Sequence, residues 1–251
     1  MAQGPSIEVQ HLRKVYGEIV AVDDLTFGVR PGAVLGLLGG NGAGKTTTIA
    51  MLLGLLEPTA GEIHVLGIDM RRRRYAALPH MNFSSPYVDL PHRLTVRQNL
   101  GFYGRLYGVR NLDRRIEEIA DHMQVRPFLD RQAGRLSAGQ KTRVALAKAL
   151  INTPAVLLLD EPTASLDPDT ADWVRGRLED YRREYSATVL LASHNMVEVE
   201  RLCERVIIMK RGRIEDDAPP AVLLDRYGRH TLEEVFLDVA RGRARLQAAA
   251  Q

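Results

Sequence analysis

The glycine-rich stretch GGNGAGKTT, residues 39–47, combines the residue types that bind phosphate groups. It matches the pattern G-x-x-x-x-G-K-[ST], with an apolar run before it and a helix-forming run after it. Lys45 can reach the β- and γ-phosphates of a nucleotide, and the Thr46 hydroxyl can bind Mg²⁺. We therefore predict a nucleotide-binding loop rather than a flexible glycine turn. The residues assigned to this loop are Gly39, Gly40, Asn41, Gly42, Ala43, Gly44, Lys45, Thr46 and Thr47.

An acidic pair in the run VLLLDEP has the chemistry to complement this loop. Asp160 ends an apolar strand, and ligands of open α/β sheets bind at the carboxyl ends of the strands. Its carboxylate can hold Mg²⁺, while Glu161 can orient or deprotonate a water that attacks the γ-phosphate. Alone, the pair would suggest a solvated turn. Together with the phosphate loop, it predicts a site for nucleotide hydrolysis.

A second candidate for phosphate binding is the run LSAGQ, at the expected start of a helix. Ser137 and Gln140 form the pattern S-x-x-Q, a capping box worth about 0.5–2 kcal/mol to a helix. The first N–H groups of a helix also attract anions when capping does not consume them all. Both interpretations can hold together, so Ser137, Gly139 and Gln140 are candidates for binding a second phosphate group.

Apolar patterns around these residues predict an α/β fold. Short all-apolar strands alternate with helices from residue 155 onward, which indicates a parallel sheet covered on both faces. The expected strands are 7–16, 25–30, 32–39, 61–67, 155–160, 187–193, 205–210 and 212–217. The expected helices are 45–56, 94–109, 113–125, 168–185, 195–204, 219–228 and 231–242. The two helices in the middle, the second with Ile116, Ile119 and Met123 on one face, suggest a separate helical lobe.

The composition fits a globular protein: of 251 residues, 45% are hydrophobic and 26% charged. Cys203 is the one cysteine, so no intrachain disulfide can form. The start of the chain has no basic and apolar leader pattern, which favours a cytosolic protein. No apolar run approaches the roughly 20 residues that span a bilayer. Arginine clusters at 71–74 and 241–245 are expected to face water.

The motifs follow one another in an order that resembles the ATP-binding subunit of an ABC (ATP-binding cassette) transporter. Behind the phosphate loop come LSAGQ, LLLDEP, SLDP at 165–168 and ASHN at 192–195. The resemblance implies a RecA-like P-loop NTPase core with a mostly parallel sheet, a small N-terminal antiparallel β region and an inserted helical lobe. We expect one ABC ATPase domain over 1–251, with the lobe at about 94–152 and small C-terminal helices at about 219–245.

The resemblance also implies a head-to-tail dimer, of this chain with itself or with a homologous subunit, around two ATP molecules. Ser137 and Gly139 would contact the γ-phosphate held by the opposing phosphate loop. Ala138 stands where the family more often has glycine. Asp167 would cross the dimer interface, although an Asp-Pro pair can also simply begin a helix.

Two further assignments rest on the resemblance. Tyr16 matches the aromatic residue that stacks on adenine; the alternative is a tyrosine packed in the core. His194 matches the switch histidine, which would hydrogen-bond the γ-phosphate and position the water beside Glu161. A lone histidine after a strand would otherwise be structural.

One residue of the family pattern is missing. A glutamine usually lies between the phosphate loop and the helical lobe, but residues 78–96 contain none, and Ser85 or Pro86 stands at its place. Asn82, Ser84 and Ser85 are the nearby polar substitutes, whereas Gln98 falls inside an expected helix. We expect this segment to dock a cytoplasmic helix of a membrane subunit; the alternative is an ordinary exposed loop. The contacts would come from Ser85, Tyr87, Leu90, His92 and Arg93.

The function implied is ATP hydrolysis, with ATP and Mg²⁺, that drives transport through separate integral membrane permease subunits. LYGV and TLEEVFLDVARG resemble the branch that exports drugs, lipids, polysaccharides or sodium. The expected place is peripheral, on the cytoplasmic face of the inner or plasma membrane, with no nucleic-acid partner. The alternatives are a soluble single-cassette ABC ATPase, as in iron–sulfur cluster assembly, and a subunit that does not hydrolyse ATP.

Overall fold

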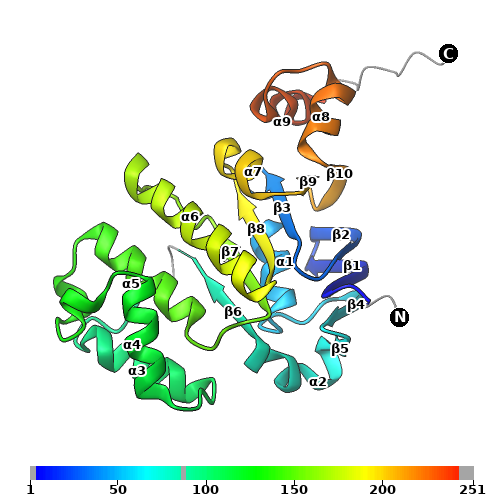
Figure 1. Cartoon of the computed structure of the whole chain (residues 1–251). Helices are drawn as coiled ribbons and strands as arrows, with labels where there is room; N and C mark the ends of the chain where they lie inside the picture. Colours follow the sequence, from blue (N-terminus) through cyan, green and yellow to red (C-terminus); the bar gives the residue numbers. More distant parts are fainter. Residues whose placement is uncertain (1–3, 86–88, 243–251) are drawn as a thin grey trace. The chain divides into compact units, whose positions relative to one another are not determined.

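The computed structural model describes residues 4–85 and 89–242. The chain splits into two compact units, Met1–Ala77 with Thr188–Gln251, and Leu78–Ala187 (Figure 1). The helical lobe predicted at about 94–152 falls inside the second unit. The organisation as one domain remains a prediction.

The first unit contains the small antiparallel sheet that the resemblance implied. Its strand order is β2-β1-β4-β5, and every neighbouring pair is antiparallel. The central strand β1 pairs through Ile7 with Val29 on one side and Val65 on the other, and all three side chains are buried. The bounds are β1 Ile7–Tyr16, β2 Ile19–Val29, β4 Ala60–Val65 and β5 Ile68–Asp69.

The first unit also holds the parallel strands that lead to the phosphate loop. Strand β3 lies between β8 and β9 and is parallel to both, while β10 is antiparallel to β9. Every residue of β3 and β8 is buried, as expected for strands covered on both faces. The bounds are β3 Val34–Gly39, β8 Thr188–Ser193, β9 Arg205–Lys210 and β10 Arg213–Ala218.

Helices of the first unit follow the predictions, except that α1 is shorter than predicted and α2 is not predicted. Their bounds are α1 Lys45–Leu52, α2 Met70–Ala77, α7 Met196–Leu202, α8 Pro220–Tyr227 and α9 Leu232–Arg241. Helix α1 stops short of the predicted residue 56 because Gly54 adopts φ +66°, outside the helical region. Helix α2 is not predicted, since its arginine run has no apolar period. Residues 243–245 of the predicted C-terminal helices lie outside the described residues.

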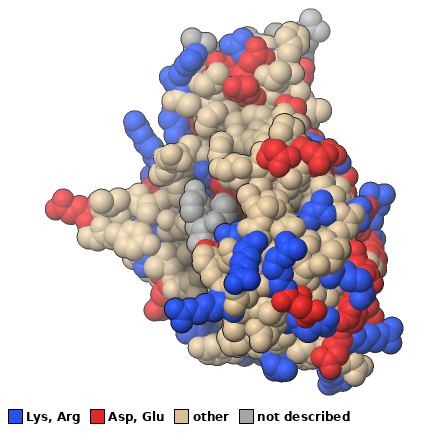
Figure 2. All heavy atoms as spheres, turned by 90° about the vertical axis from the view of Figure 1, so that its left-hand side faces the viewer, with Lys and Arg blue, Asp and Glu red and all other residues tan. Residues whose placement is uncertain are grey.

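The arginines of α2 are exposed, as expected for a solvated face. Two of them are paired: Arg71 Nε lies 3.1 Å from a carboxylate oxygen of Glu57, and Arg72 Nε lies 3.4 Å from Asp69. On the face drawn in Figure 2, Lys and Arg side chains likewise lie beside Asp and Glu. Such exposed pairs contribute little to stability.

The second unit consists of a parallel strand pair and helices. Strand β6 Met81–Ser84 runs parallel to β7 Val156–Asp160. The helices are α3 Val96–Leu106, α4 Leu112–His122, α5 Ala138–Leu150 and α6 Pro168–Tyr185, with 3₁₀ turns η1 Leu78–His80, η2 Arg126–Phe128 and η3 Ala133–Arg135. Ile116, Ile119 and Met123 are buried, which confirms the predicted apolar face.

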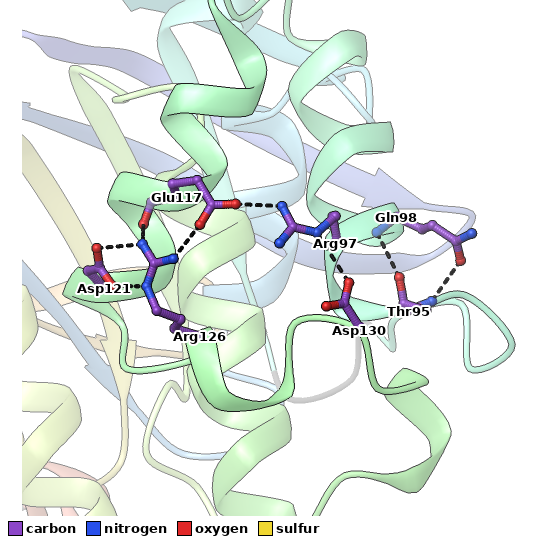
Figure 3. A network of polar contacts seen from close by, with 7 residues as sticks. All are labelled: Thr95, Arg97, Gln98, Glu117, Asp121, Arg126 and Asp130. Atoms are coloured by element: carbon purple, nitrogen blue, oxygen red, sulfur yellow. Dashed lines mark hydrogen bonds and ion pairs between the residues drawn. The ribbon is translucent and has the colours of Figure 1, made fainter.

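A polar network fixes α3, α4 and the turn η2 to one another (Figure 3). Glu117 on α4 accepts from Arg97 on α3 at 2.6 Å and from Arg126 in η2 at 2.5 Å. Arg97 also donates to Asp130, and Arg126 to Asp121. The hydrogen bond from Arg97, followed by that from Arg126, lowers the pKa of Glu117. The network therefore stays charged below the ordinary pKa of a glutamate.

Replacing Glu117 with glutamine is expected to lower the unfolding midpoint at neutral pH. Because the pKa of Glu117 is lowered in the folded chain, its contribution is present above the unfolded value of about 4.3 and is lost as pH falls through the folded pKa. Thermal melts of both proteins from pH 7 to pH 3 test this. The two midpoints should converge at low pH, and a difference that is independent of pH contradicts the network's role.

Candidate nucleotide-binding site

The phosphate loop leaves the end of β3 and opens α1, as its motif predicts. Gly44 is the N-cap of α1 with φ 102°, and a Cβ there would lie 2.7 Å from the carbonyl oxygen of Ala21. Only glycine fits this position without strain. A glycine N-cap has no side chain to occupy the first N–H groups of the helix, so these groups can donate to an anion.

Lys45 is the first residue of α1 and is only 8% exposed. Its Nζ donates to the carbonyl oxygen of Gly39 at 2.5 Å and lies 3.4 Å from that of Gly40. The ammonium group is thus folded over the inner side of its own loop. Thr46 beside it is exposed and Thr47 is half-buried. The predicted phosphate-binding side chains therefore gather at one helix start.

Segments that are distant in sequence support the loop from outside. The N–H of Gly212, in the turn between β9 and β10, donates to the carbonyl oxygen of Ala43 at 3.1 Å. Phe236 on α9 borders the loop, since a Cβ added to Gly40 would lie 4.0 Å from its ring. Neither residue carries a sequence signal that could have predicted this contact.

His194 lies at the same sheet edge as the phosphate loop. It follows β8 directly, and Ser193 at the end of β8 is the register partner of Leu38 in β3. Parallel strands that are paired in register release their following loops at one edge of the sheet. The His194 side chain is exposed there. The structure thus brings this predicted residue to the edge where the loop begins.

Tyr16 ends β1 and is 47% exposed, so the alternative of a core-packed tyrosine is wrong. The ammonium group of Lys14 lies over its ring, 5.0 Å from the ring centroid, in a cation–π contact. The neighbouring strand β2 reaches the phosphate loop through Ala21, beside Gly44. An accessible aromatic face therefore lies on the hairpin that touches the loop.

The acidic pair ends a strand of the second unit as predicted. Asp160 is the last residue of β7 and is 4% exposed. Glu161 adopts φ +53°, in the left-handed region that glutamate rarely occupies. Its carbonyl oxygen accepts from the N–H of Ala164 at 3.0 Å, which closes a turn. Strain of this kind persists where the surrounding structure holds it and is frequent at functional sites.

Ser137 and Gln140 form the predicted capping box at the start of α5. The N–H of Gln140 donates to Ser137 Oγ at 3.3 Å, and the N–H of Ser137 donates to Gln140 Oε1 at 3.1 Å. The box leaves out the N–H groups of Ala138 and Gly139, which have no acceptor within the helix. Capping and anion binding are therefore compatible at this helix start.

Asp167 caps α6, so it does begin a helix. The N–H of Thr170 donates to Asp167 Oδ1 at 3.0 Å, and donation by the backbone and hydroxyl of Thr170 lowers the pKa of Asp167. A Cβ added to Gly139 would lie 3.3 Å from Thr170 Oγ1. The second unit thus brings the starts of α5 and α6 together. A role of Asp167 in a dimer interface remains a prediction.

The segment without the glutamine offers fewer free polar groups than the sequence suggested. Asn82 is 2% exposed, and its amide group donates to Asn152 at 2.8 Å and to the carbonyl oxygen of Lys148 at 3.3 Å. Asn82 is therefore committed to the packing of β6 against α5. Gln98 lies inside α3, as predicted, and forms a capping box with Thr95 (Figure 3).

The predicted docking residues differ in accessibility. Ser85 and Leu90 are 7% and 8% exposed, so little of either side chain is available to a partner. His92 and Arg93 are exposed. Pro86 and Tyr87 lie outside the described residues. The docking role of this segment remains a prediction.

The parallel sheet and the phosphate loop together define a nucleotide-binding α/β protein with a P-loop. Comparisons with known proteins agree with this class. The family model "ABC transporter" matches residues 22–164. The chain belongs to the ABC transporter family, and it binds and hydrolyses ATP as an ATP-binding subunit of that family.

One relative and two solved structures show how far the likeness extends. The Nod factor export ATP-binding protein I of Paraburkholderia xenovorans (strain LB400) is 38% identical over 231 residues, which are 91% of this chain and 76% of the relative. The structure of an ATP binding subunit of an ABC transporter covers 93% of this chain and 99% of its own, with TM-score 0.85 and 26% identity. The structure of a dimeric ATP-binding cassette in a post-hydrolysis state with ADP and Pi covers 85% of this chain and 98% of its own, with TM-score 0.76 and 25% identity. These likenesses confirm the predicted family and the RecA-like fold.

Within residues 4–85 and 89–242, no helix combines the length and the apolar character needed to cross a membrane.

Proposed function

We propose that this chain powers export as a head-to-tail ATPase dimer, bound at the cytoplasmic face of the inner or plasma membrane to separate permease subunits. The relative from Paraburkholderia xenovorans is named an export protein, and a structural neighbour is a dimeric cassette bound to ADP and Pi. Both names support export and dimerisation over the iron–sulfur alternative. The dimer partner is a second copy or a homologous subunit.

The observation that carries the proposal is that one chain has two helix starts suited to phosphate. Helix α1 begins at Gly44 without a side-chain cap, and α5 begins with the N–H groups of Ala138 and Gly139 outside its capping box. One γ-phosphate needs donors on more than one side as charge develops during transfer. Two chains placed head to tail supply a loop from one and an LSAGQ helix start from the other.

In this proposal each site residue has one task. Lys45 and the loop N–H groups bind the β- and γ-phosphates, and Tyr16 stacks on adenine. Glu161 orients or deprotonates the attacking water, and His194 holds that water and the γ-phosphate in place. Ser137 and Gly139 donate to the γ-phosphate bound by the partner.

The donors also suit Mg²⁺. Thr46 offers an exposed hydroxyl at the start of α1, and Asp160 offers a carboxylate at the end of β7. Mg²⁺ prefers such oxygen ligands together with phosphate oxygens. When bound, it would neutralise charge between the β- and γ-phosphates.

A complementation assay tests the head-to-tail arrangement. Lys45→Ala damages the site on its own phosphate loop, whereas Ser137→Arg damages the site of the partner. Each variant alone is expected to be nearly inactive. A mixed dimer regains one intact site, made by the loop of the Ser137→Arg chain and the LSAGQ motif of the Lys45→Ala chain, so mixing should restore ATPase activity.

The control for this assay is a mixture in which both changes are placed on one chain and the partner is Lys45→Ala. No intact site can form in that mixture. Ser137→Arg must also still bind ATP as an isolated monomer, because its own loop is unchanged. If the ATPase activity of the first mixture does not exceed that of the control mixture, the head-to-tail site is contradicted.

A further inference from the structure

The loop that carries His194 is tied to Glu198 on both sides, to its carboxylate through Ser193 and to its backbone N–H through Asn195. Glu198, on α7, is fully buried and accepts from the hydroxyl of Ser193 at 2.7 Å. The same hydroxyl oxygen accepts from the N–H of Asn195 at 3.0 Å, and the Asn195 side chain lies 3.4 Å from the N–H of Glu198 as the N-cap of α7. Ser193 and Asn195, which flank His194, are thus joined to each other and to Glu198.

Helix α7 itself is held firmly against the strand that enters the phosphate loop. A Cβ added to Gly36 on β3 would lie 3.0 Å from Cys203 Sγ and 3.4 Å from a methyl group of Val199, so α7 packs directly on β3. Val199 and Leu202 on this helix are buried. Glu198 therefore lies on a helix that packs against the strand leading into the phosphate loop.

A carboxylate in this place needs an explanation beyond helix packing. Burying a charged side chain is costly unless it gains strong polar contacts, and an apolar residue would pack this helix face at lower cost. Glu198 also affects its neighbour Cys203. Burial is the larger cause, and the Glu198 carboxylate the smaller cause, of a raised pKa of the Cys203 thiol. The Glu198 carboxylate accepts from the Ser193 hydroxyl, whose oxygen in turn accepts from the N–H of Asn195, so it holds the residues on either side of His194 through that hydroxyl.

We propose that Glu198 is a positioning residue for ATP hydrolysis: it acts through Ser193 and Asn195 to hold the His194 backbone, and with it the imidazole, at the γ-phosphate. The proposal rests on the proposed role of His194. Glu198 need not touch nucleotide in this arrangement. A misplacement of a catalytic group by about 1 Å can cost about 10²-fold in rate.

Three variants of this residue pair separate the possible roles. Glu198→Gln keeps a carbonyl oxygen that can accept from Ser193, so it should retain most activity. Glu198→Ala removes the acceptor and should lower kcat by about 10- to 100-fold, with KM for ATP little changed because the phosphate loop is intact. His194→Ala should lower kcat by on the order of 10²-fold or more.

The decisive measurement is a double-mutant cycle on kcat. If Glu198 acts through His194, Glu198→Ala should cause little further loss in the His194→Ala background. A further loss equal to that in the wild-type background overturns the positioning role. Full activity of Glu198→Ala in the wild-type background overturns it too. Unchanged kcat in His194→Ala instead overturns the proposed role of His194, which separates the two failures.

A matched control shows whether the effect is only loss of a buried carboxylate. Asp216 on β10 is 4% exposed and pairs with Arg226 on α8, in the same unit. Asp216→Asn should lower the unfolding midpoint without changing kcat at a temperature where both variants are folded. If Glu198→Ala lowers kcat only at temperatures where it unfolds, as judged by circular dichroism, its role is structural and the proposal fails.

Discussion

Glu161→Gln is expected to abolish steady-state ATP hydrolysis while leaving Mg-ATP binding intact. The amide cannot take a proton from the attacking water, and a positioned general base contributes about 10²–10⁴-fold to such steps. The nucleotide contacts come from the phosphate loop, which the change does not touch. Glu161 also holds a left-handed backbone conformation, which glutamine can adopt as well as glutamate, so the turn should survive.

Phosphate release and equilibrium ATP binding measure these two effects separately. Glu233→Gln serves as a matched control, because Glu233 is exposed in the first turn of α9. The control should hydrolyse ATP at the wild-type rate. Wild-type turnover in Glu161→Gln removes the glutamate from the mechanism, and loss of ATP binding there points to a structural role for this side chain.

Lys45→Ala is expected to weaken ATP binding and to reduce turnover further. A hydrogen bond to a charged group is worth about 1.5–3 kcal/mol, and each 1.4 kcal/mol is a factor of ten in affinity. The dissociation constant for ATP should therefore rise by about 10- to 100-fold. The lysine is buried and donates to the carbonyl oxygen of Gly39, so its loss also loosens the loop.

Isothermal titration with a non-hydrolysable ATP analogue gives the affinity, and a thermal melt checks that the variant is folded. Lys45→Ala with wild-type affinity and wild-type turnover contradicts the assignment of the phosphate loop.

Much of the fold could be predicted because apolar pattern and local chemistry agree. The structure confirms the predicted limits of β1, α6 and β9 to the residue. Continuous apolar runs bounded by turns mark buried strands, and Pro168 after Asp167 marks a helix start. Helix α2 was missed because four adjacent arginines carry no apolar period, and its backbone departs from helical geometry at Arg73.

In the site, features that depend on residues close in sequence could be predicted, whereas contacts from residues far along the chain could not. Motifs correctly placed the loop at the start of α1 and the capping box at the start of α5, since both depend on residues close in sequence. The supports from Gly212 and Phe236 come from far along the chain and follow only from tertiary packing. Asn82 was a candidate substitute for the missing glutamine, but its partner Asn152 commits it to structure.

Glu198 had one readable signal. It lies four residues after His194, on the helix face that also carries Val199 and Leu202, where an apolar residue is the usual choice. A charged residue at an expected core position calls for a specific partner. Its carboxylate accepts from Ser193, and its backbone N–H donates to Asn195; both residues flank His194, and these contacts could be identified only in three dimensions.

The head-to-tail ATP dimer is tested most directly by light scattering of Glu161→Gln at saturating Mg-ATP. Trapped ATP should join two chains, so the measured mass should rise to twice the 28.0 kDa of one chain. Adding Ser137→Arg to the same chain should return the mass to that of a monomer while ATP remains bound to its own loop. A Glu161→Gln protein that binds ATP and keeps the mass of one chain contradicts the account.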